Sequence, residues 1–155
     1  MADSANDFSW QRLIQQAESL CGMSSNHISN AANLSALLYR ELDDVSWAGF
    51  YFLSGETLMV GPFQGKSACV SIEMGEGVCG VAAASGLTIR VADVKEFDKH
   101  IVCDSDTHSE IVVPLFKLGR LFGVLDLDSS RLGRFSQEDE VGLIALAQVY
   151  MSSVV

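Results

Sequence analysis

Four cysteines are the residues of this 155-residue chain best suited to covalent chemistry, and Cys103 stands out among them. It lies in the polar stretch HIVCDSDTHSEI, residues 100–111, where no apolar pattern calls for a thiol. The histidines of this stretch favour a thiolate, whereas its aspartates oppose ionisation, so the sequence leaves the protonation state open. We therefore expect chemistry at Cys103.

The other three cysteines fit apolar positions. Cys21 falls on the apolar face of a predicted helix, and Cys69 alternates with Val70 and Ile72 as in a buried strand. Cys79 lies in a GVCG segment that begins a short helix, where the helix dipole lowers the pKa of a thiol. Taken one at a time, each is expected to be a small core residue.

Metal binding is the competing interpretation of the thiols. His100, Cys103 and His108 could supply ligands, with Cys69 and Cys79 as distant partners. Structural zinc sites usually carry a closely spaced Cys-x-x-Cys pair, which this sequence lacks. Because phosphate-binding and serine-nucleophile motifs are also missing, we predict no bound metal or cofactor.

Asp126 and Asp128 form a second group with chemical potential. In a strand they point to the same face, and such pairs usually face solvent. If Glu110 joined them in a concave site, burial and repulsion would raise at least one pKa. A neutral carboxylic acid could then donate a proton, and the site would also accept an amino group.

These residues are positioned by a predicted α+β fold in which helices pack on one face of a sheet. Helical periodicity covers residues 10–21 and 28–41, a short helix within 75–86 ends at Gly86, and a Ser136/Asp139 capping box begins a closing helix. Strands are expected over 45–53, 58–63, 68–74, 87–94 and the two arms of a hairpin over 109–128. Residues 95–108 have no period and are expected to form an exposed loop.

Composition restricts the class of protein. Hydrophobic residues make up 48% of the chain, enough for one domain over residues 1–155. A net charge of −10 argues against nucleic acid or anionic membranes as partners. The N-terminal MADSANDFSW lacks the features of a signal peptide, so we expect a cytoplasmic protein whose cysteines are not a permanent disulfide framework.

Several motifs, in order, closely resemble the free methionine-(R)-sulfoxide reductases, which are stand-alone GAF-domain enzymes. They are WAGFY, GPFQGKSACVSI, GEGVCG, CDSDTHSEIVVPL and GVLDLDS. The steps of 10 residues from Cys69 to Cys79 and of 24 to Cys103 reproduce the three-cysteine pattern of the family. The resemblance runs from about residue 34 to 143, and the DSDTHS segment departs from many relatives.

The resemblance implies an antiparallel sheet flanked by helices, a homodimer, and reduction of free L-methionine-(R)-sulfoxide. Cys103 matches the catalytic cysteine, which becomes a sulfenic acid, and Cys69 the resolving cysteine, which forms a disulfide with it. Cys79 matches an additional resolving or auxiliary thiol. A thioredoxin-type protein would reduce the disulfide, and the loop over residues 95–108 is expected to move between redox states.

The resemblance also implies a substrate site. Glu110, Asp126 and Asp128 match the acids that hold the substrate and polarise its oxygen, and Asp128 is expected to be the proton donor or the group that polarises the oxygen. Trp47 and Tyr51 match the aromatic wall around the methyl group. A ligand-sensing GAF module that binds a cyclic nucleotide is the alternative, and reactive thiols would be unnecessary for it.

Overall fold

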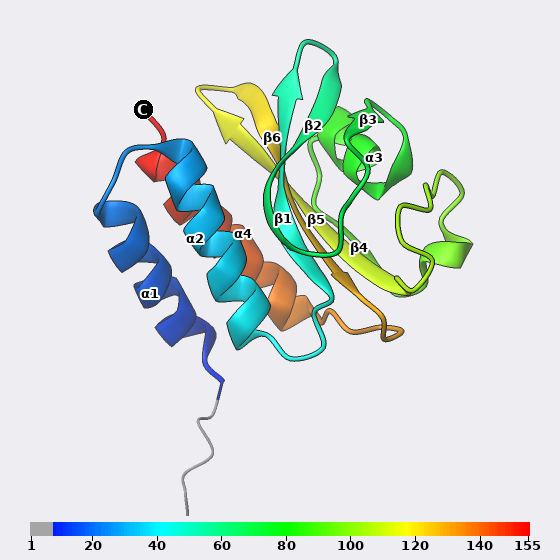
Figure 1. Ribbon diagram of the computed structural model, residues 1–155, viewed down its shortest axis with the longest axis horizontal. Helices are drawn as coiled ribbons and strands as arrows, with labels where there is room; N and C mark the ends of the chain where they lie inside the picture. The colour runs from blue at the N-terminus through cyan, green and yellow to red at the C-terminus, as the bar shows by residue number, and fades with distance from the viewer. Residues whose placement is uncertain (1–7) are drawn as a thin grey trace, which may run out of the picture.

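A six-stranded antiparallel sheet with the order β3-β2-β1-β6-β5-β4 forms the centre of the computed structural model, which describes residues 8–155 (Figure 1). The strands are β1 (Trp47–Ser54), β2 (Thr57–Gly65), β3 (Ser71–Glu73), β4 (Ile89–Val91), β5 (Ser109–Lys117) and β6 (Arg120–Ser129). The helices are α1 (Trp10–Gly22), α2 (His27–Glu41), α3 (Gly77–Ser85) and α4 (Gln137–Ser153), with a 3-10 turn η1 at Val94–Glu96.

Three helices cover one face of the sheet. Figure 1 shows α2 and α4 lying against the strands and α1 outside them. Apolar side chains that alternate along the central strands, such as Phe50, Leu125 and Leu127, are completely buried beneath these helices. The predicted capping box is confirmed, since Ser136 and Asp139 each accept a hydrogen bond from the other's backbone N–H. This layer is the main hydrophobic core.

The opposite face carries α3, so the prediction that the helices lie on one face is wrong for this helix. Its buried residues are small apolar ones, and a Cβ at Gly80 would collide with the carbonyl oxygen of Glu73. Close packing of this kind is what glycine and alanine allow. The predicted helix end is confirmed at Gly86, whose φ of 71° is left-handed.

The two edge strands are shorter than the alternation of the sequence indicates. The strand predicted over 68–74 is only β3, and that over 87–94 is only β4. Each has one neighbouring strand, so few hydrogen bonds extend it. Cys69 therefore lies outside a strand, in the segment before β3, which corrects its predicted position.

The β5–β6 hairpin is confirmed and sets the register of the site. Its turn places Leu118 and Gly119 at φ values of 50° and 76°, as a two-residue turn of primed type requires. Glu110 on β5 is thereby paired with Asp128 on β6. Among residues 8–155, no helix is long and apolar enough to cross a membrane.

Candidate active site

A cavity of about 50 Å³ lies on the α3 side of the sheet. Its walls come from β1, β3, β5, β6 and the start of α3, together with parts of two connecting segments, 66–68 and 100–107. All eight residues of the predicted site belong to this region, and seven of them line the cavity directly. The eighth, Cys69, is joined to the lining through Cys103.

The three predicted acids meet on the floor of the cavity. Glu110 is paired with Asp128 across the hairpin, and Asp126 lies two residues farther along the same face of β6. Glu110 is 8% exposed and Asp126 is 5% exposed. One carboxylate oxygen of Asp126 and one of Asp128 are buried without a hydrogen-bond partner. The concave acidic site is confirmed, and a solvent-facing pair of aspartates is excluded.

Burial controls the protonation of these acids. It raises the pKa of Glu110 and of Asp128 well above the ordinary range, and repulsion from Asp126 raises both further. Burial also raises the pKa of Asp126, to about 6, although hydrogen bonds from Glu110 and Cys79 oppose the shift. Asp126 therefore ionises first, and a neutral acid lies beside a carboxylate near pH 7.

Cys79 contacts this cluster from the first turn of α3. Its Sγ lies 3.9 Å from Oε1 of Glu110, as a weak donor. Burial, followed by repulsion from Asp126 and Glu110, raises the thiol pKa well above its ordinary value. The helix dipole therefore does not produce a low-pKa thiol here, contrary to the sequence-based expectation.

Within the described part of the chain, one group of side chains has ligand atoms that could hold a metal ion. It consists of Cys79, Glu110 and Asp126. One atom from each lies within 4.8 Å of the other two. This group contains neither histidine of the zinc alternative, and Cys69 and Cys103 are joined in a disulfide. The zinc site considered from the sequence is therefore not assembled.

Trp47 and Tyr51 on β1 form an aromatic wall, with ring centroids 5.8 Å apart. Trp47 also stacks on Phe63, with centroids 5.1 Å apart. Both wall residues hold the segment before β3 by hydrogen bonds. Nε1 of Trp47 donates to the carbonyl oxygen of Lys66 at 3.1 Å, and the Tyr51 hydroxyl donates to that of Cys69 at 3.0 Å.

Cys69 and Cys103 form a disulfide at the edge of the cavity, with Cα atoms 5.5 Å apart. The pairing implied by the resemblance is thus present, and 5.5 Å is an ordinary separation for it. Cys103 is exposed and Cys69 is half-buried. Cys21 is a buried free thiol far from these residues in the main core, as expected.

Lys66 is a site residue that the sequence patterns do not identify. Its Nζ lies 2.9 Å from Asp106 Oδ2 and 3.7 Å from Asp104 Oδ2, so it joins the two segments that carry the disulfide cysteines. The hydrogen bond raises the pKa of Lys66 and lowers that of Asp106. A lysine three residues before Cys69 was the available signal, but its partners lie about 40 residues away.

Known proteins are similar to this chain in sequence and in fold. Residues 11–153 match the GAF domain family. A free methionine-R-sulfoxide reductase of Escherichia coli (strain K12) is 53% identical over 119 residues, which cover 77% of this chain and 72% of that protein. The region of similarity therefore covers most of each chain.

Two solved structures of similar proteins contain a bound substrate. The fRMsr of Staphylococcus aureus, in complex with substrate, is 41% identical and has a TM-score of 0.91, covering 97% of this chain and 98% of that chain. The free methionine-R-sulfoxide reductase from Neisseria meningitidis, in complex with its substrate, is 38% identical and has a TM-score of 0.92, covering 99% and 92%. The predicted α+β GAF fold and the family resemblance are confirmed, and this chain belongs to the GAF-domain family and, within it, to the free methionine-R-sulfoxide reductases.

Proposed function

We propose that this protein reduces free L-methionine-(R)-sulfoxide to L-methionine, with Cys103 as the nucleophile and Cys69 as the resolving thiol. The observation that carries the proposal is the Cys69–Cys103 disulfide at the edge of a cavity whose floor holds buried acids. The relatives crystallised with substrate support the same reaction class.

The reaction oxidises two thiols and reduces one sulfoxide. The sulfur of Cys103 attacks the sulfoxide sulfur, accepts its oxygen and becomes a sulfenic acid, while methionine leaves. The thiol of Cys69 then attacks the sulfenic acid, which forms the disulfide and releases water. The 5.5 Å separation of the two Cα atoms supports this second step.

The acids supply what the sulfoxide oxygen needs in order to leave. Asp128, whose pKa is raised by burial, is the proposed proton donor to that oxygen. Asp126 is the acid that ionises most readily, so its carboxylate is suited to bind the substrate ammonium. Glu110 lies next to both, and Trp47 and Tyr51, which line the same cavity, are proposed to contact the methyl group of the substrate.

Cys79 is assigned an auxiliary role in this scheme. Its thiol is buried, has a raised pKa, and lies next to Glu110 and not in the disulfide. A neutral thiol is a poor nucleophile, and it can donate a weak hydrogen bond to the acid cluster.

The disulfide requires an external dithiol to complete the cycle. A thioredoxin-type protein, with a potential of about −270 mV, is the proposed donor, in the reducing cytoplasm. The chain needs no bound cofactor in this scheme. The homodimer implied by the resemblance belongs to the same proposal, and sedimentation equilibrium tests it.

The test is an assay of the purified protein with thioredoxin, thioredoxin reductase and NADPH. Free methionine-(R)-sulfoxide should be reduced, whereas the free S epimer and peptide-bound sulfoxides should not. Cys103→Ser should abolish turnover, and Cys21→Ser, which changes a thiol in the other core, serves as the matched control. Activity restricted to peptides or to the S epimer would reject the proposal, as would cyclic nucleotide binding by an inactive protein.

A further inference from the structure

Two exposed valines flank the disulfide. Val70 is 65% exposed and Val102 is 66% exposed, and each is the chain neighbour of one disulfide cysteine. Because the cysteine Cα atoms are 5.5 Å apart and neighbouring Cα atoms are about 3.8 Å apart, the Cα atoms of the two valines are at most about 13 Å apart.

Packing does not account for these valines. Ala68, the other chain neighbour of Cys69, and Ile101, two positions before Cys103, pack partly against the core on the α3 side. Val70 and Val102 do not belong to either core. Neither valine lines the cavity. We call Val70, Val102 and the disulfide between them the disulfide patch.

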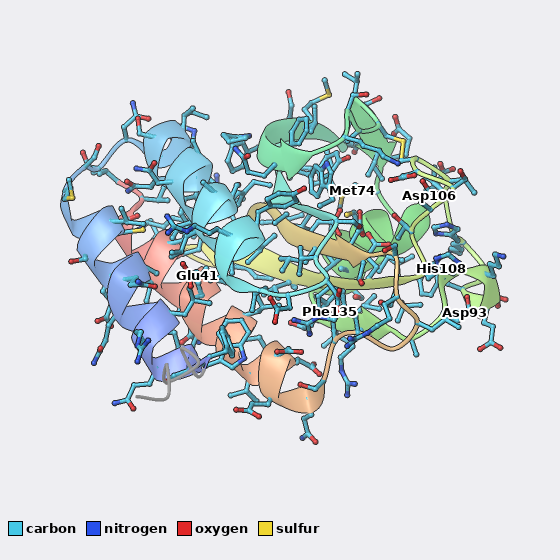
Figure 2. All side chains as sticks on the ribbon, turned by 60° about the horizontal axis from the view of Figure 1, so that its bottom comes forward. Glu41, Met74, Asp93, Asp106, His108 and Phe135 are labelled. Atoms are coloured by element: carbon cyan, nitrogen blue, oxygen red, sulfur yellow. A yellow bond between two sulfur atoms is a disulfide. The ribbon has the colours of Figure 1, made fainter. Side chains whose placement is uncertain are left out.

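The patch has a polar border. The Lys66–Asp106 ion pair lies beside it, on the two segments that carry the cysteines. Figure 2 shows Asp106 on the outer loop, at the end of the molecule opposite α1. An apolar centre with a charged border is the usual anatomy of a protein interface.

We infer that the disulfide patch is the docking surface for the dithiol protein that reduces Cys69–Cys103, a conclusion that rests on the proposed function. The disulfide itself identifies the occupant, because a reducing thiol must come into line with its two sulfur atoms. Val70 and Val102 are exposed and each is bonded to one cysteine of the disulfide, so a protein that brings a thiol there comes close to both.

The exposure of the two cysteines assigns the sulfur that is attacked. Cys103 is exposed, whereas Cys69 is half-buried and held through its carbonyl oxygen by Tyr51. A thiolate of the partner bonds to Sγ of Cys103, the disulfide bond breaks, and its electron pair leaves on Cys69, which takes up a proton. The second partner thiolate then attacks the partner sulfur of the mixed disulfide. This step releases Cys103 as a thiolate and leaves the partner oxidised.

The test uses Val70→Asp and Val102→Asp in the full-length protein. A carboxylate buried at the interface is unfavourable, so each change should raise the KM for thioredoxin about tenfold. Turnover supported by dithiothreitol, and disulfide formation in a single turnover with substrate, should not change. Val141→Asp, which places the same charge on α4 at a valine that is 63% exposed, is the matched control and should not change the KM.

The outcomes separate this inference from the proposed function. An unchanged KM for thioredoxin in both variants would overturn the docking surface, while dithiothreitol-supported reduction by the unmodified protein would leave the reductase intact. Loss of self-association in the variants, with no effect on thioredoxin, would assign the patch to a second copy of this chain and overturn the inference. No reduction with either thiol would instead reject the reductase.

The attacked sulfur is tested with a thioredoxin whose second active-site cysteine is replaced by serine. Such a protein stops at the mixed disulfide, which mass spectrometry can locate after proteolysis. The expected adduct is on Cys103 with Cys69 as a free thiol. An adduct on Cys69 would overturn the assignment.

Discussion

At the scale of single residues, the acids of the site differ in the proton they carry, and this difference divides their roles. Asp128→Asn preserves the shape of the side chain but removes the proposed proton donor. Sulfoxide reduction should slow by about 10²- to 10⁴-fold, the usual contribution of a positioned acid. The measurement is the single-turnover rate of disulfide formation. Asp98→Asn, at an exposed aspartate of the nearby loop, should leave that rate unchanged, and an unaffected rate in Asp128→Asn would contradict the assignment.

Ionisation of the buried Asp126 carboxyl group should lower the free energy of unfolding, so stability should depend on pH. Its pKa is about 6 in the folded protein against 3.8 ordinarily, so between these values the folded state holds a proton that the unfolded state has lost. Asp126 alone should therefore make the free energy of unfolding fall as pH rises from about 4 to 6, by at most about 3 kcal/mol. Glu110 and Asp128, whose pKa values are also raised, add to this fall. Asp126→Asn should make this fall smaller and stabilise the substrate-free protein at pH 7, while weakening substrate binding.

Urea unfolding at pH 4, 5, 6 and 7 measures this effect. The exposed Asp98→Asn provides the control, because it should keep the pH dependence of the unmodified protein. An Asp126→Asn variant whose stability falls as steeply as that of the unmodified protein would show that Asp126 does not contribute.

The sequence predicts the positions of the acids correctly but not that of Cys69. The spacing of Asp126 and Asp128 places them on one strand face, and the hairpin pattern brings Glu110 opposite, so the acid cluster follows from local rules. Cys69 illustrates the limit. The apolar alternation around it indicates a strand, but the chain leaves the sheet there because Trp47 and Tyr51 bind its backbone carbonyls. Those bonds join residues about 18 positions apart and have no signature in the local pattern.

At the scale of elements, the aromatic wall on β1 positions the segment that carries the resolving thiol. Tyr51→Phe keeps the ring and removes the hydroxyl that donates to the Cys69 carbonyl oxygen. We expect the formation of the disulfide to slow several-fold, because a typical hydrogen bond contributes about 1 kcal/mol. Trapping the Cys103 sulfenic acid with dimedone measures its lifetime, which should lengthen.

Tyr150→Phe is the matched control for this change, since that hydroxyl donates to the His27 carbonyl oxygen in the opposite core. It should leave the lifetime of the sulfenic acid unchanged. Equal lifetimes in Tyr51→Phe and the unmodified protein would mean that the bond to Cys69 does not position it.

The segment from Phe97 to Thr107 makes few bonds to the rest of the molecule. They include the Cys69–Cys103 disulfide, the exposed Lys66 ion pairs, and a hydrogen bond from the Gly77 N–H to the Lys99 carbonyl oxygen. Exposed ion pairs stabilise by only about 0–1 kcal/mol, so the disulfide is the main tether. Reduction should therefore speed amide hydrogen exchange more in this segment than in α4, whose exchange follows only the stability of the whole chain. Equal exchange in both redox states would contradict loop motion.

Prediction of the elements succeeds where the signal is local and fails where it is not. The Ser136 capping box and the β5–β6 hairpin are confirmed, because caps and two-residue turns are specified by adjacent residues. The side of the sheet on which α3 packs depends instead on long-range contacts. Its small residues and Gly80 show how closely it can approach, but not from which side.

At the scale of the whole molecule, the sheet separates the main hydrophobic core from the candidate active site. The face under α1, α2 and α4 holds a continuous apolar core, and the face under α3 combines a smaller core with the buried acids and the disulfide. Burying acids is unfavourable, and the larger core offsets it from across the sheet.

The redox cycle should change the stability of the entire chain as well as its active site. The disulfide joins residues 34 positions apart, and closing a loop of that length stabilises a protein by roughly 2–4 kcal/mol, mainly by restricting the unfolded chain. Each catalytic cycle would then alternate between a more stable oxidised form and a less stable reduced form. Urea unfolding with and without dithiothreitol measures the difference, and Cys69→Ser, which cannot form this disulfide, should unfold identically under both conditions. If the unmodified protein also unfolded at one midpoint in both conditions, the disulfide would be a local link with no effect on global stability.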